Sequence, residues 1–522
     1  MSELIESGIN NLGDFIEDSL AMYADKPAFS CQGKTLSYQD IEIKSRALAC
    51  WLQQETNLQP GDRIVIQLPN IIQYPIAAYA ALRAGLVVVN TNPMYTPKEM
   101  RHQFKDSGAK AIITLQDLLP KLNEVIADTQ IDHVIMCSMD DLSQDTKAYV
   151  EGIGKFITLN QALQQGESKT LKPRMNINLD DTCVLQYTGG TTGVSKGAEL
   201  THKNLISNAR QTMGVFDGQL GEQEIFVCPL PLYHIYAFAV NMMSLFSRGV
   251  HNVLIPNPRD MTAFIKDIKP FKFSGFSGIN TLFVGLCTVP EFKALDFSNF
   301  KYTLSGGSTL TTDAVTAWKK VTGCSISEGY GLSETASVVC LNQPGKEWVG
   351  TVGKPVLKTD IQIWDDQDQP VAIGMEGQIV LKGPQVMKGY WNMPEETQQA
   401  IINGYFKTGD VGKILDDGFV KIVDRLKDMI IVSGFNVYPN EVEEVLTRHP
   451  SILEAAVVGQ DDDKTGERVC AYITVSGEVS SEDVIRHCRE ELTNYKVPKK
   501  VFFMDELPKS TVGKILRREL RQ

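Results

Sequence analysis

The chain has 522 residues, of which 43% are hydrophobic and 22% are charged, and its formal net charge is −12 at pH 7. This length and composition predict a globular protein with several domains and a substantial buried core. The negative charge argues against nucleic acid as a partner and against strong attraction to anionic membranes, because both would repel the chain.

The cysteines and the N-terminus indicate a compartment. Ten cysteines are scattered without a Cys-x-x-Cys pair, which is typical of a reducing environment. Glu3 and Glu6 precede any apolar run, so the N-terminus does not resemble a signal peptide. We expect a cytoplasmic protein, either monomer or homodimer, with weak peripheral contact at the inner face of the membrane as an alternative.

The chain begins with two predicted helices. Apolar residues recur at helical spacing within residues 1–30, and a second helical pattern runs from Leu36 to Trp51. The apolar positions of the first pattern are Leu12, Phe15, Ile16, Leu20 and Tyr23. This spacing predicts an amphipathic helix that packs on the body of the protein or on a second subunit.

From Arg63 onward, short apolar strands alternate with helical segments, as in α/β layers whose sheets are covered on both faces. The predicted strands are Arg63–Leu68, Leu86–Asn90, Ala111–Thr114, His133–Cys137, Asp181–Gln186, Asn252–Ile255, Tyr302–Ser305 and Ser325–Glu328. Residues 140–180 are polar and weakly patterned, and we expect an irregular connection there.

One stretch without acidic or basic residues, 225–247, is long enough to span a bilayer, which takes about 20 residues. Pro229, Pro231, His234 and Asn241 interrupt its apolar run. We therefore predict a buried strand at 225–230, a turn and a core helix at 235–246, and we disfavour a transmembrane segment.

Beyond about residue 350, strands shorten and turns crowd together, which indicates a compact β-rich subdomain. The charged cluster 424–428 lies between two apolar strands and marks a predicted boundary. A helix from Pro439, strands at 455–459 and 469–475, and a helix at 481–492 then predict a small α+β domain. We divide the chain into residues 1–424, a hinge at 425–428, and residues 429–522.

The first candidate site is the glycine-rich segment Tyr187–Gly197, which follows an apolar strand pattern and precedes Thr201, a candidate helix N-cap. Its glycines allow close backbone approach, and its hydroxyls and Lys196 suit phosphate oxygens and a metal ion. The spacing differs from the common P-loop, where Lys directly follows Gly and precedes Ser or Thr. The alternative is a flexible surface turn.

The second candidate site is the segment Glu328–Thr335. Tyr330 lies between Gly329 and Gly331, which leaves its ring free to stack on a flat base. Glu334 is a hard oxygen ligand of the kind that Mg²⁺ uses beside substrate phosphates. A core tyrosine and a helix-capping glutamate are the alternatives, and these residues alone do not decide between them.

Two charged residues follow further along the chain. Asp410 comes after a tight turn, where its carboxylate could accept two ribose hydroxyls or stabilise the turn itself. The segment 507–515 ends near Lys514, a cation that could stabilise charge as it develops in a transition state. A solvated basic loop is the alternative there.

Taken in order, these segments resemble the AMP-forming adenylating enzymes: acyl-CoA synthetases, luciferases and the adenylation domains of nonribosomal peptide synthetases. The resemblance implies an α/β fold with a large N-terminal adenylate-forming domain, comprising two α/β layered subdomains and a small β-barrel subdomain. A small, mobile α+β lid domain carrying a catalytic lysine would follow. Ser195 departs from the pattern, since most members carry Pro there.

The resemblance implies ATP, Mg²⁺ and CoA and assigns roles residue by residue. The implied ATP- and AMP-binding residues are Thr188, Gly189, Gly190, Thr191, Thr192, Gly193, Lys196, Gly306, Gly307, Glu328, Gly329, Tyr330, Gly331, Ser333, Asp410, Arg425 and Lys514. The implied catalytic residues are Lys514, Glu334, Thr191 and His234; Thr188 and Glu334 are the implied metal ligands, and Lys427 is the implied hinge. A satisfied core histidine and a surface lysine remain the alternatives for His234 and Lys427.

Segments 90–97, 277–283, 383–391 and 432–439 look most like those of bacterial long-chain fatty-acyl-CoA synthetases. The implied acyl and CoA path comprises His234, Phe238, Gly278, Ser433 and Gly434. Such an enzyme converts a fatty acid and ATP to acyl-AMP and pyrophosphate, and then transfers the acyl group to CoA. The alternatives are a fatty-acyl-AMP ligase that loads a carrier protein, a CoA ligase for medium-chain or aryl acids, and a non-catalytic nucleotide-binding regulator.

Overall fold

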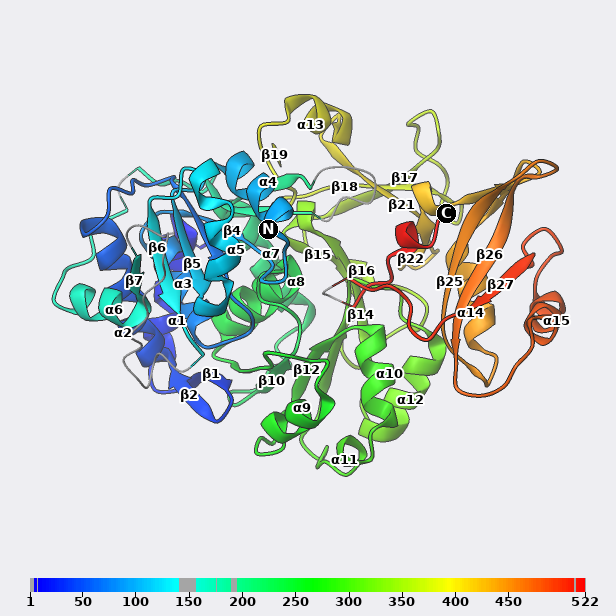
Figure 1. Ribbon diagram of the computed structural model, residues 1–522, viewed down its shortest axis with the longest axis horizontal. Coiled ribbons are helices and arrows are strands. Elements are labelled where there is room, and N and C mark those ends of the chain that lie inside the picture. The colour runs from blue at the N-terminus through cyan, green and yellow to red at the C-terminus, as the bar shows by residue number, and fades with distance from the viewer. Residues whose placement is uncertain are drawn as a thin grey trace.

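Figure 1 shows the computed structural model, in which residues 4–6, 8–139, 156–174, 176–188, 195–510 and 513–521 are described. Two large sheets with helices packed on them form most of the molecule, and a smaller antiparallel sheet adjoins them. One apolar core connects these sheets, whereas residues from Ile430 onward build a separate core around a fourth sheet. The fold is therefore mixed α/β, with a large N-terminal and a small C-terminal domain.

The first large sheet has eight strands in the order β19-β9-β8-β4-β3-β5-β6-β7. Its strands from β8 to β7 run parallel, and β9 and β19 are antiparallel to their neighbours. The strands are β3 (Arg63–Gln67), β4 (Val87–Asn90), β5 (Ala111–Leu115), β6 (His133–Cys137), β7 (Phe156–Thr158), β8 (Thr182–Tyr187), β9 (Gly197–Thr201) and β19 (Gly389–Tyr390).

The second large sheet has nine strands in the order β16-β15-β14-β13-β12-β10-β11-β1-β2. Its central strands from β14 to β1 are parallel, and both edges end in antiparallel strands. The strands are β1 (Pro27–Cys31), β2 (Lys34–Ser37), β10 (Ile225–Cys228), β11 (His251–Leu254), β12 (Gly275–Gly278), β13 (Tyr302–Ser305), β14 (Ser327–Leu332), β15 (Ser337–Leu341) and β16 (Lys354–Pro355).

The helices of these layers begin at clear sequence signals. Ser37 and Thr96 form capping boxes with Asp40 and Glu99, and Thr201 caps its helix as predicted. The helices are α1 (Leu12–Met22), α2 (Tyr38–Gln54), α3 (Gln73–Arg83), α4 (Pro97–Ser107), α5 (Leu119–Asn123), α6 (Leu159–Glu167), α7 (His202–Val215), α8 (Ile235–Ala237), α9 (Met261–Ile268), α10 (Asn280–Thr288), α11 (Pro290–Lys293) and α12 (Thr312–Thr322). The predicted amphipathic first helix is α1, and its apolar side is buried.

The β-rich subdomain and the C-terminal domain follow the sequence patterns. The implied small β-barrel takes the form of a five-stranded antiparallel sheet: β17 (Asp360–Trp364), β18 (Gly377–Lys382), β20 (Ile401–Ile402), β21 (Tyr405–Ile414) and β22 (Val420–Arg425), with α13 (Pro394–Ala400) beside it. The C-terminal domain contains β23 (Ile430–Val432), β24 (Phe435–Val437), α14 (Pro439–Thr447), β25 (Ile452–Asp462), β26 (Gly466–Val475), α15 (Ser481–Glu491) and β27 (Lys500–Phe503). The helices and strands of the C-terminal domain confirm the predicted α+β arrangement.

The predicted strands are all present, with ends that differ by a few residues. The irregular connection predicted for 140–180 is wrong in part, since β7 and α6 lie there; residues 140–155 are outside the described residues. Leu159, Ala162, Leu163 and Gly166 form the buried side of α6, an i, i+3, i+4, i+7 pattern that polar neighbours obscure.

The glycine-rich segment also differs from expectation, because it connects antiparallel strands β8 and β9 before α7 begins.

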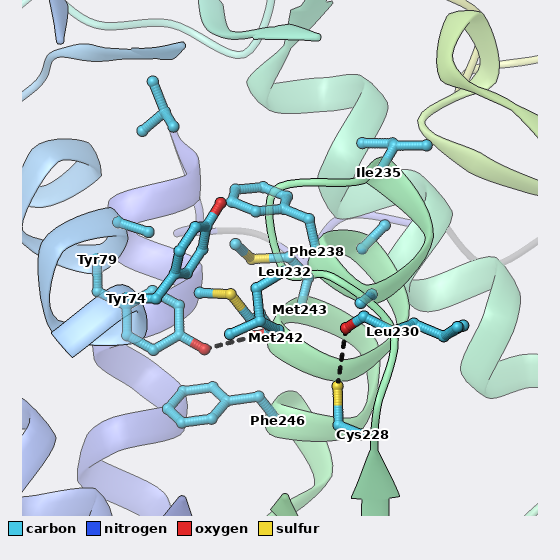
Figure 2. Close-up of a cluster of buried hydrophobic side chains, with 14 of the residues drawn as sticks. Tyr74, Tyr79, Cys228, Leu230, Leu232, Ile235, Phe238, Met242, Met243 and Phe246 are labelled. Atoms are coloured by element: carbon cyan, nitrogen blue, oxygen red, sulfur yellow. Dashed lines mark hydrogen bonds between the residues drawn. The ribbon is translucent and has the colours of Figure 1, made fainter. Parts of the chain in front are cut away.

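The predicted core helix at 235–246 is not a regular α-helix. One turn of α8 passes into a π-helix, η3 (Phe238–Leu245), and then a 3₁₀ turn, η4 (Phe246–Arg248). Figure 2 shows how aromatic and methionine side chains pack around it, and the Tyr79 hydroxyl donates to the Met242 carbonyl at 2.6 Å. Such outside donors can satisfy backbone carbonyls where the regular α-helical pattern is broken. Within the described ranges, none of the helices combines the length and the apolar character needed to cross a membrane.

Gly166 allows α6 to approach α2 closely, and its replacement should destabilise the fold. A Cβ at this position would lie 1.9 Å from the Ala47 carbonyl oxygen, so the helices would have to separate. We expect Gly166→Ala to lower the free energy of unfolding by about 1–3 kcal/mol.

Gly214→Ala in α7 is the matched control, because nothing lies within 4 Å of its Cβ; it should stabilise the protein by about 0.5–1 kcal/mol. Denaturant unfolding of both variants measures the difference, and equal effects would contradict the close-approach argument.

Candidate functional site

A large cleft of about 3070 Å³ lies where the two large sheets, the β21–β22 hairpin and the C-terminal domain meet. Every described residue with an implied ATP role lines it, although the segments that supply them are far apart in the sequence. These residues are Thr188, Lys196, Gly306, Gly307, Glu328, Gly329, Tyr330, Gly331, Ser333, Asp410, Arg425 and Lys514. The remaining implied residues, Gly189, Gly190, Thr191, Thr192 and Gly193, lie outside the described residues.

Both ends of the glycine-rich segment are anchored where they leave β8 and enter β9. The Thr188 N–H donates to the Lys196 carbonyl at 2.9 Å, and the Ser195 hydroxyl donates to the Thr188 carbonyl at 2.5 Å. His102 Nε2 lies 2.9 Å from the Ser195 carbonyl, which ties this end to α4. The Lys196 ammonium lies 5.1 Å from the centre of the Tyr390 ring, an arrangement that holds a cation at the cleft wall.

The segment from Glu328 to Glu334 comprises most of β14 and the start of the turn after it, and it lines the cleft. Burial raises the pKa of Glu328 to about 8 and raises the pKa of Glu334, whose carboxylate accepts a 2.9 Å hydrogen bond from Tyr390. At Gly331 a Cβ would lie 1.5 Å from the Ser337 carbonyl oxygen, so only glycine lets β14 pair with β15 here. A half-buried carboxylate with a raised pKa is a group that a bound cation would stabilise.

Asp410 and Tyr330 meet across two sheets. The Tyr330 hydroxyl donates to Asp410 Oδ2 at 2.5 Å, and Arg425 Nε lies 3.6 Å from Asp410 Oδ1. Asp410 and Arg425 are directly opposite on β21 and β22, so strand register holds this pair together. The Asp410 N–H donates to Thr408 Oγ1 at 3.0 Å, so the turn is closed by the Thr408 side chain, whereas the Asp410 carboxylate contacts Tyr330 and Arg425.

Lys514 enters the same cleft from the C-terminal domain. Its loop packs on the N-terminal domain so closely that a Cβ at Gly513 would lie 2.5 Å from Ile279 Cδ1. Burial and the neighbouring Arg425 lower the pKa of Lys514 to about 7, opposed by Asp410. The solvated basic loop is therefore not what the structure shows.

The pKa of Lys514 has a consequence for the pH dependence of adenylation. The lysine is a cation below about pH 7 and neutral above it. If the cation is required, kcat/KM for ATP in the first half-reaction should fall as pH rises through about 7, because this quantity reports the free enzyme. Pyrophosphate release measured across pH checks this, and the alkaline limb should be absent from Lys514→Ala. A wild-type profile that stays flat above pH 7 would contradict the assignment.

His234 lies at the start of α8 and lines the cleft, as the resemblance implies. Its Nδ1 accepts from the Tyr236 N–H at 3.3 Å, and burial and Lys514 lower its pKa to about 4, so the ring is neutral. Both readings of His234 therefore hold in part: it caps a core helix, and it faces the cleft.

The other implied acyl and CoA path residues lie away from the cleft wall. Phe238 is fully buried in the cluster of Figure 2, and a Cβ at Gly278 would lie 2.7 Å from the Phe283 ring. Ser433 and Gly434 form the exposed β23–β24 turn, both with positive φ. Among the described residues of the implied acyl and CoA path, His234 is therefore the only one that lines the cleft with the nucleotide-binding residues.

Lys427 lies in the 3₁₀ turn η6 (Leu426–Asp428) between the two domains and lines the cleft. Burial and Arg425 lower its pKa, while Asp428, Asp410 and Glu334 act in the opposite sense. The lysine therefore faces the cleft's charged groups in addition to the nearby Asp428.

Sequence reasoning missed two residues of the site. Tyr390 contacts both Glu334 and Lys196, although the sequence indicates its segment, 383–391, only through the family resemblance. Arg517 lies three residues after Lys514 and makes buried ion pairs near the hinge. The basic run at 517–518 was the only available signal for it.

The chain is similar in sequence to known proteins over nearly its whole length. The family model described as AMP-binding enzyme matches residues 16–391, and that of the AMP-binding enzyme C-terminal domain matches residues 441–514. A long-chain-fatty-acid–CoA ligase of Escherichia coli O6:H1 is 42% identical over 100% of this chain and 96% of its own length. One of Bacillus subtilis is 37% identical over 98% and 94%.

A solved structure of similar fold contains a nucleotide. The crystal structure of ATP-bound MatB from Rhodopseudomonas palustris has a TM-score of 0.87 and 28% identity, covering 98% of each chain. The two family models together match segments of both the N-terminal and the C-terminal domain. The chain belongs to the AMP-binding enzyme family, within the adenylate-forming superfamily that includes the acyl-CoA synthetases.

Proposed function

We propose that the protein is a long-chain fatty acid–CoA ligase of the AMP-forming type. One observation carries this: Lys514 of the C-terminal domain shares a cleft with Glu334 and the Tyr330–Asp410 pair of the N-terminal domain. The full-length relatives named long-chain-fatty-acid–CoA ligase support the substrate class. The protein is accordingly an acid–thiol ligase that uses ATP and CoA.

The cleft has an apolar side that suits a hydrocarbon chain. Tyr236, whose N–H donates to His234, packs with Val240, Leu304, Val338 and Leu341 in one apolar cluster, and all five line the cleft. A carboxylate at His234 would then have apolar surface on one side and the nucleotide groups on the other. Burial of a fatty chain there would contribute roughly 0.8 kcal/mol for each CH₂ removed from water.

In the first half-reaction, a carboxylate oxygen of the fatty acid attacks the α-phosphorus of ATP, and the bond to pyrophosphate breaks. Tyr330 offers a ring for the adenine, and Asp410 with Arg425 offers partners for the ribose hydroxyls. Lys196 and Lys514 offset the negative charge on the phosphates and the carboxylate. The second half forms a thioester bond between the CoA sulfur and the acyl carbonyl, AMP leaves, and the thiol proton is released. Both halves depend on positioning and charge neutralisation.

The residues present also fit a magnesium ion. Glu334 supplies a carboxylate that accepts a hydrogen bond from Tyr390 and whose pKa is raised by burial, and Thr188 supplies a hydroxyl at the same cleft. Oxygen ligands of this kind, with substrate phosphates, are what Mg²⁺ prefers. Bound there, the ion would neutralise charge on the phosphates.

The test is a product analysis with purified protein. Oleate, ATP and Mg²⁺ should release pyrophosphate, and adding CoA should yield oleoyl-CoA and AMP. A panel from acetate to oleate defines the preferred chain length. Acyl-AMP that accumulates identically with and without CoA would favour the fatty-acyl-AMP ligase, and no AMP or pyrophosphate with any acid would refute the proposal.

We also propose that residues 425–428 act as a hinge between an adenylation domain, 1–424, and a lid domain, 429–522. The turn η6 separates β22, the last strand of the five-stranded antiparallel sheet, from the C-terminal core that starts at Ile430, and this separation supports the division. Cytoplasmic location, with weak contact at the inner membrane face as the alternative, and a monomeric or homodimeric state stay predictions.

A further inference from the structure

Arg517 connects the loop that carries Lys514 (residues 508–516, the lysine loop) to both sides of the proposed hinge. It begins the 3₁₀ turn η7 (Arg517–Glu519), and its side chain is only 17% exposed. Its guanidinium donates to the two carboxylate oxygens of Glu443 at 2.9 and 2.6 Å and to Asn440 Oδ1 at 2.6 Å. This bidentate contact attaches the end of the loop to α14 with defined geometry.

The same guanidinium reaches the hinge itself. Its Nη1 lies 3.5 Å from Asp428 Oδ2 and 3.9 Å from Asp424 Oδ1. The Asp424 side chain is fully buried and accepts the Asn440 N–H at 2.7 Å, while Asn440 Nδ2 donates to the Val423 carbonyl at 3.1 Å. Because Val423 and Asp424 lie near the end of β22 and Asn440 lies in the first turn of α14, these bonds join the two domains across the hinge.

The lysine loop is closed at its base and supported on both sides. The Leu516 N–H donates to the Pro508 carbonyl and the Ser510 N–H to the Lys514 carbonyl, each at 2.8 Å. At the N-terminal end of the loop, Lys509 pairs with Glu454 at 2.8 Å. Arg517 directly follows the C-terminal end of the loop. The position of Lys514 therefore depends on how this base is held against α14 and the hinge.

We infer that Arg517 is a positioning residue for adenylation, which holds the C-terminal domain so that Lys514 lies in the nucleotide cleft. The inference rests on the proposed function and extends it to Arg517, a residue to which the family resemblance assigns no role. A buried network of this kind contributes little to stability on balance but favours one arrangement of its partners. Removing the guanidinium leaves Glu443, Asp424 and Asp428 without their shared cation, so the cross-hinge contacts weaken.

The test compares R517Q and R517K with a matched control, R448Q. Arg448 is in the same domain and also pairs with two carboxylates, Glu444 and Glu491, but its side chain is 46% exposed. Adenylation is measured by pyrophosphate–ATP exchange with oleate, and thioester formation by mixing synthetic oleoyl-AMP with CoA. We expect R517Q to lower the kcat of adenylation about 10²-fold, with little change in thioester formation. R517K should recover part of the loss, and R448Q should match wild type.

A pH profile distinguishes positioning from simple loss of structure. Lys514 is surrounded by Arg425, Arg517, Asp410, Asp428 and His234, and Arg517 is one of the cations that lower its pKa. The residual adenylation of R517Q should therefore keep its alkaline limb but show it at higher pH than wild type. A global packing defect would lower the rate without moving the limb.

The outcomes separate this inference from the proposed function. If wild type forms neither acyl-AMP nor acyl-CoA, the proposed function fails; if it forms both and R517Q behaves like it, only the inference fails. Equal losses in the two half-reactions would also overturn the inference. Should R517Q melt at a much lower temperature than wild type, E443Q provides the same comparison, because its amide oxygen can still accept the Val457 N–H while the negative charge is lost.

Discussion

Replacing Lys514 by alanine should lower the rate of adenylation by about 10²- to 10³-fold, the range seen when a preorganised charge-stabilising group is removed. The lysine lies in the cleft beside Asp410 and Arg425, where negative charge from the phosphates and the carboxylate must be balanced. Because the free carboxylate and the triphosphate are present only in the first half, thioester formation from synthetic acyl-AMP should continue. Pyrophosphate release and acyl-CoA formation are measured separately.

The control for this variant is Lys500→Ala, which removes an exposed lysine of the same domain on β27. It should leave both half-reactions unchanged. If Lys514→Ala lost both halves equally, the lysine would have a role in folding or in thiol transfer, and its assignment to adenylation would be wrong.

Glu334→Gln should have the second largest effect. Glutamine keeps the shape of the side chain and can still accept the hydrogen bond from Tyr390, but it has no charge to offer a metal ion. We expect adenylation at saturating Mg²⁺ to fall by about 10²-fold and the apparent affinity for Mg²⁺ to weaken. Pyrophosphate release titrated with Mg²⁺ measures both quantities.

Tyr390→Phe is the matched comparison for Glu334. It removes the hydrogen bond to the carboxylate while keeping the charge and the ring beside Lys196. The Mg²⁺ titration of this variant should remain close to that of wild type. A Glu334→Gln enzyme with unchanged dependence on Mg²⁺ would show that the carboxylate has a structural role only.

Several elements could be predicted because their signals are local. The buried strands from Arg63 to Ser305 are short apolar runs bounded by turns, and the caps at Ser37, Thr96 and Thr201 are compact patterns. Polar positions on exposed helix faces explain the failure at α6, whose buried side is only four residues. The π-helical turn at Phe238–Leu245 has no comparable signal, since it depends on packing against other elements.

The sequence by itself determined which chemical groups this protein carries and in what order, because glycine turns, caps and apolar periodicity act within a few residues of the chain. Only the tertiary structure decided which of those groups meet. Tyr330 and Asp410 are 80 residues apart and Arg517 and Glu443 are 74 apart, and each pair forms through the packing of separate elements. The physical reason is that strand order, register and domain orientation follow from burial summed over the whole chain, so no local pattern encodes a contact across the cleft.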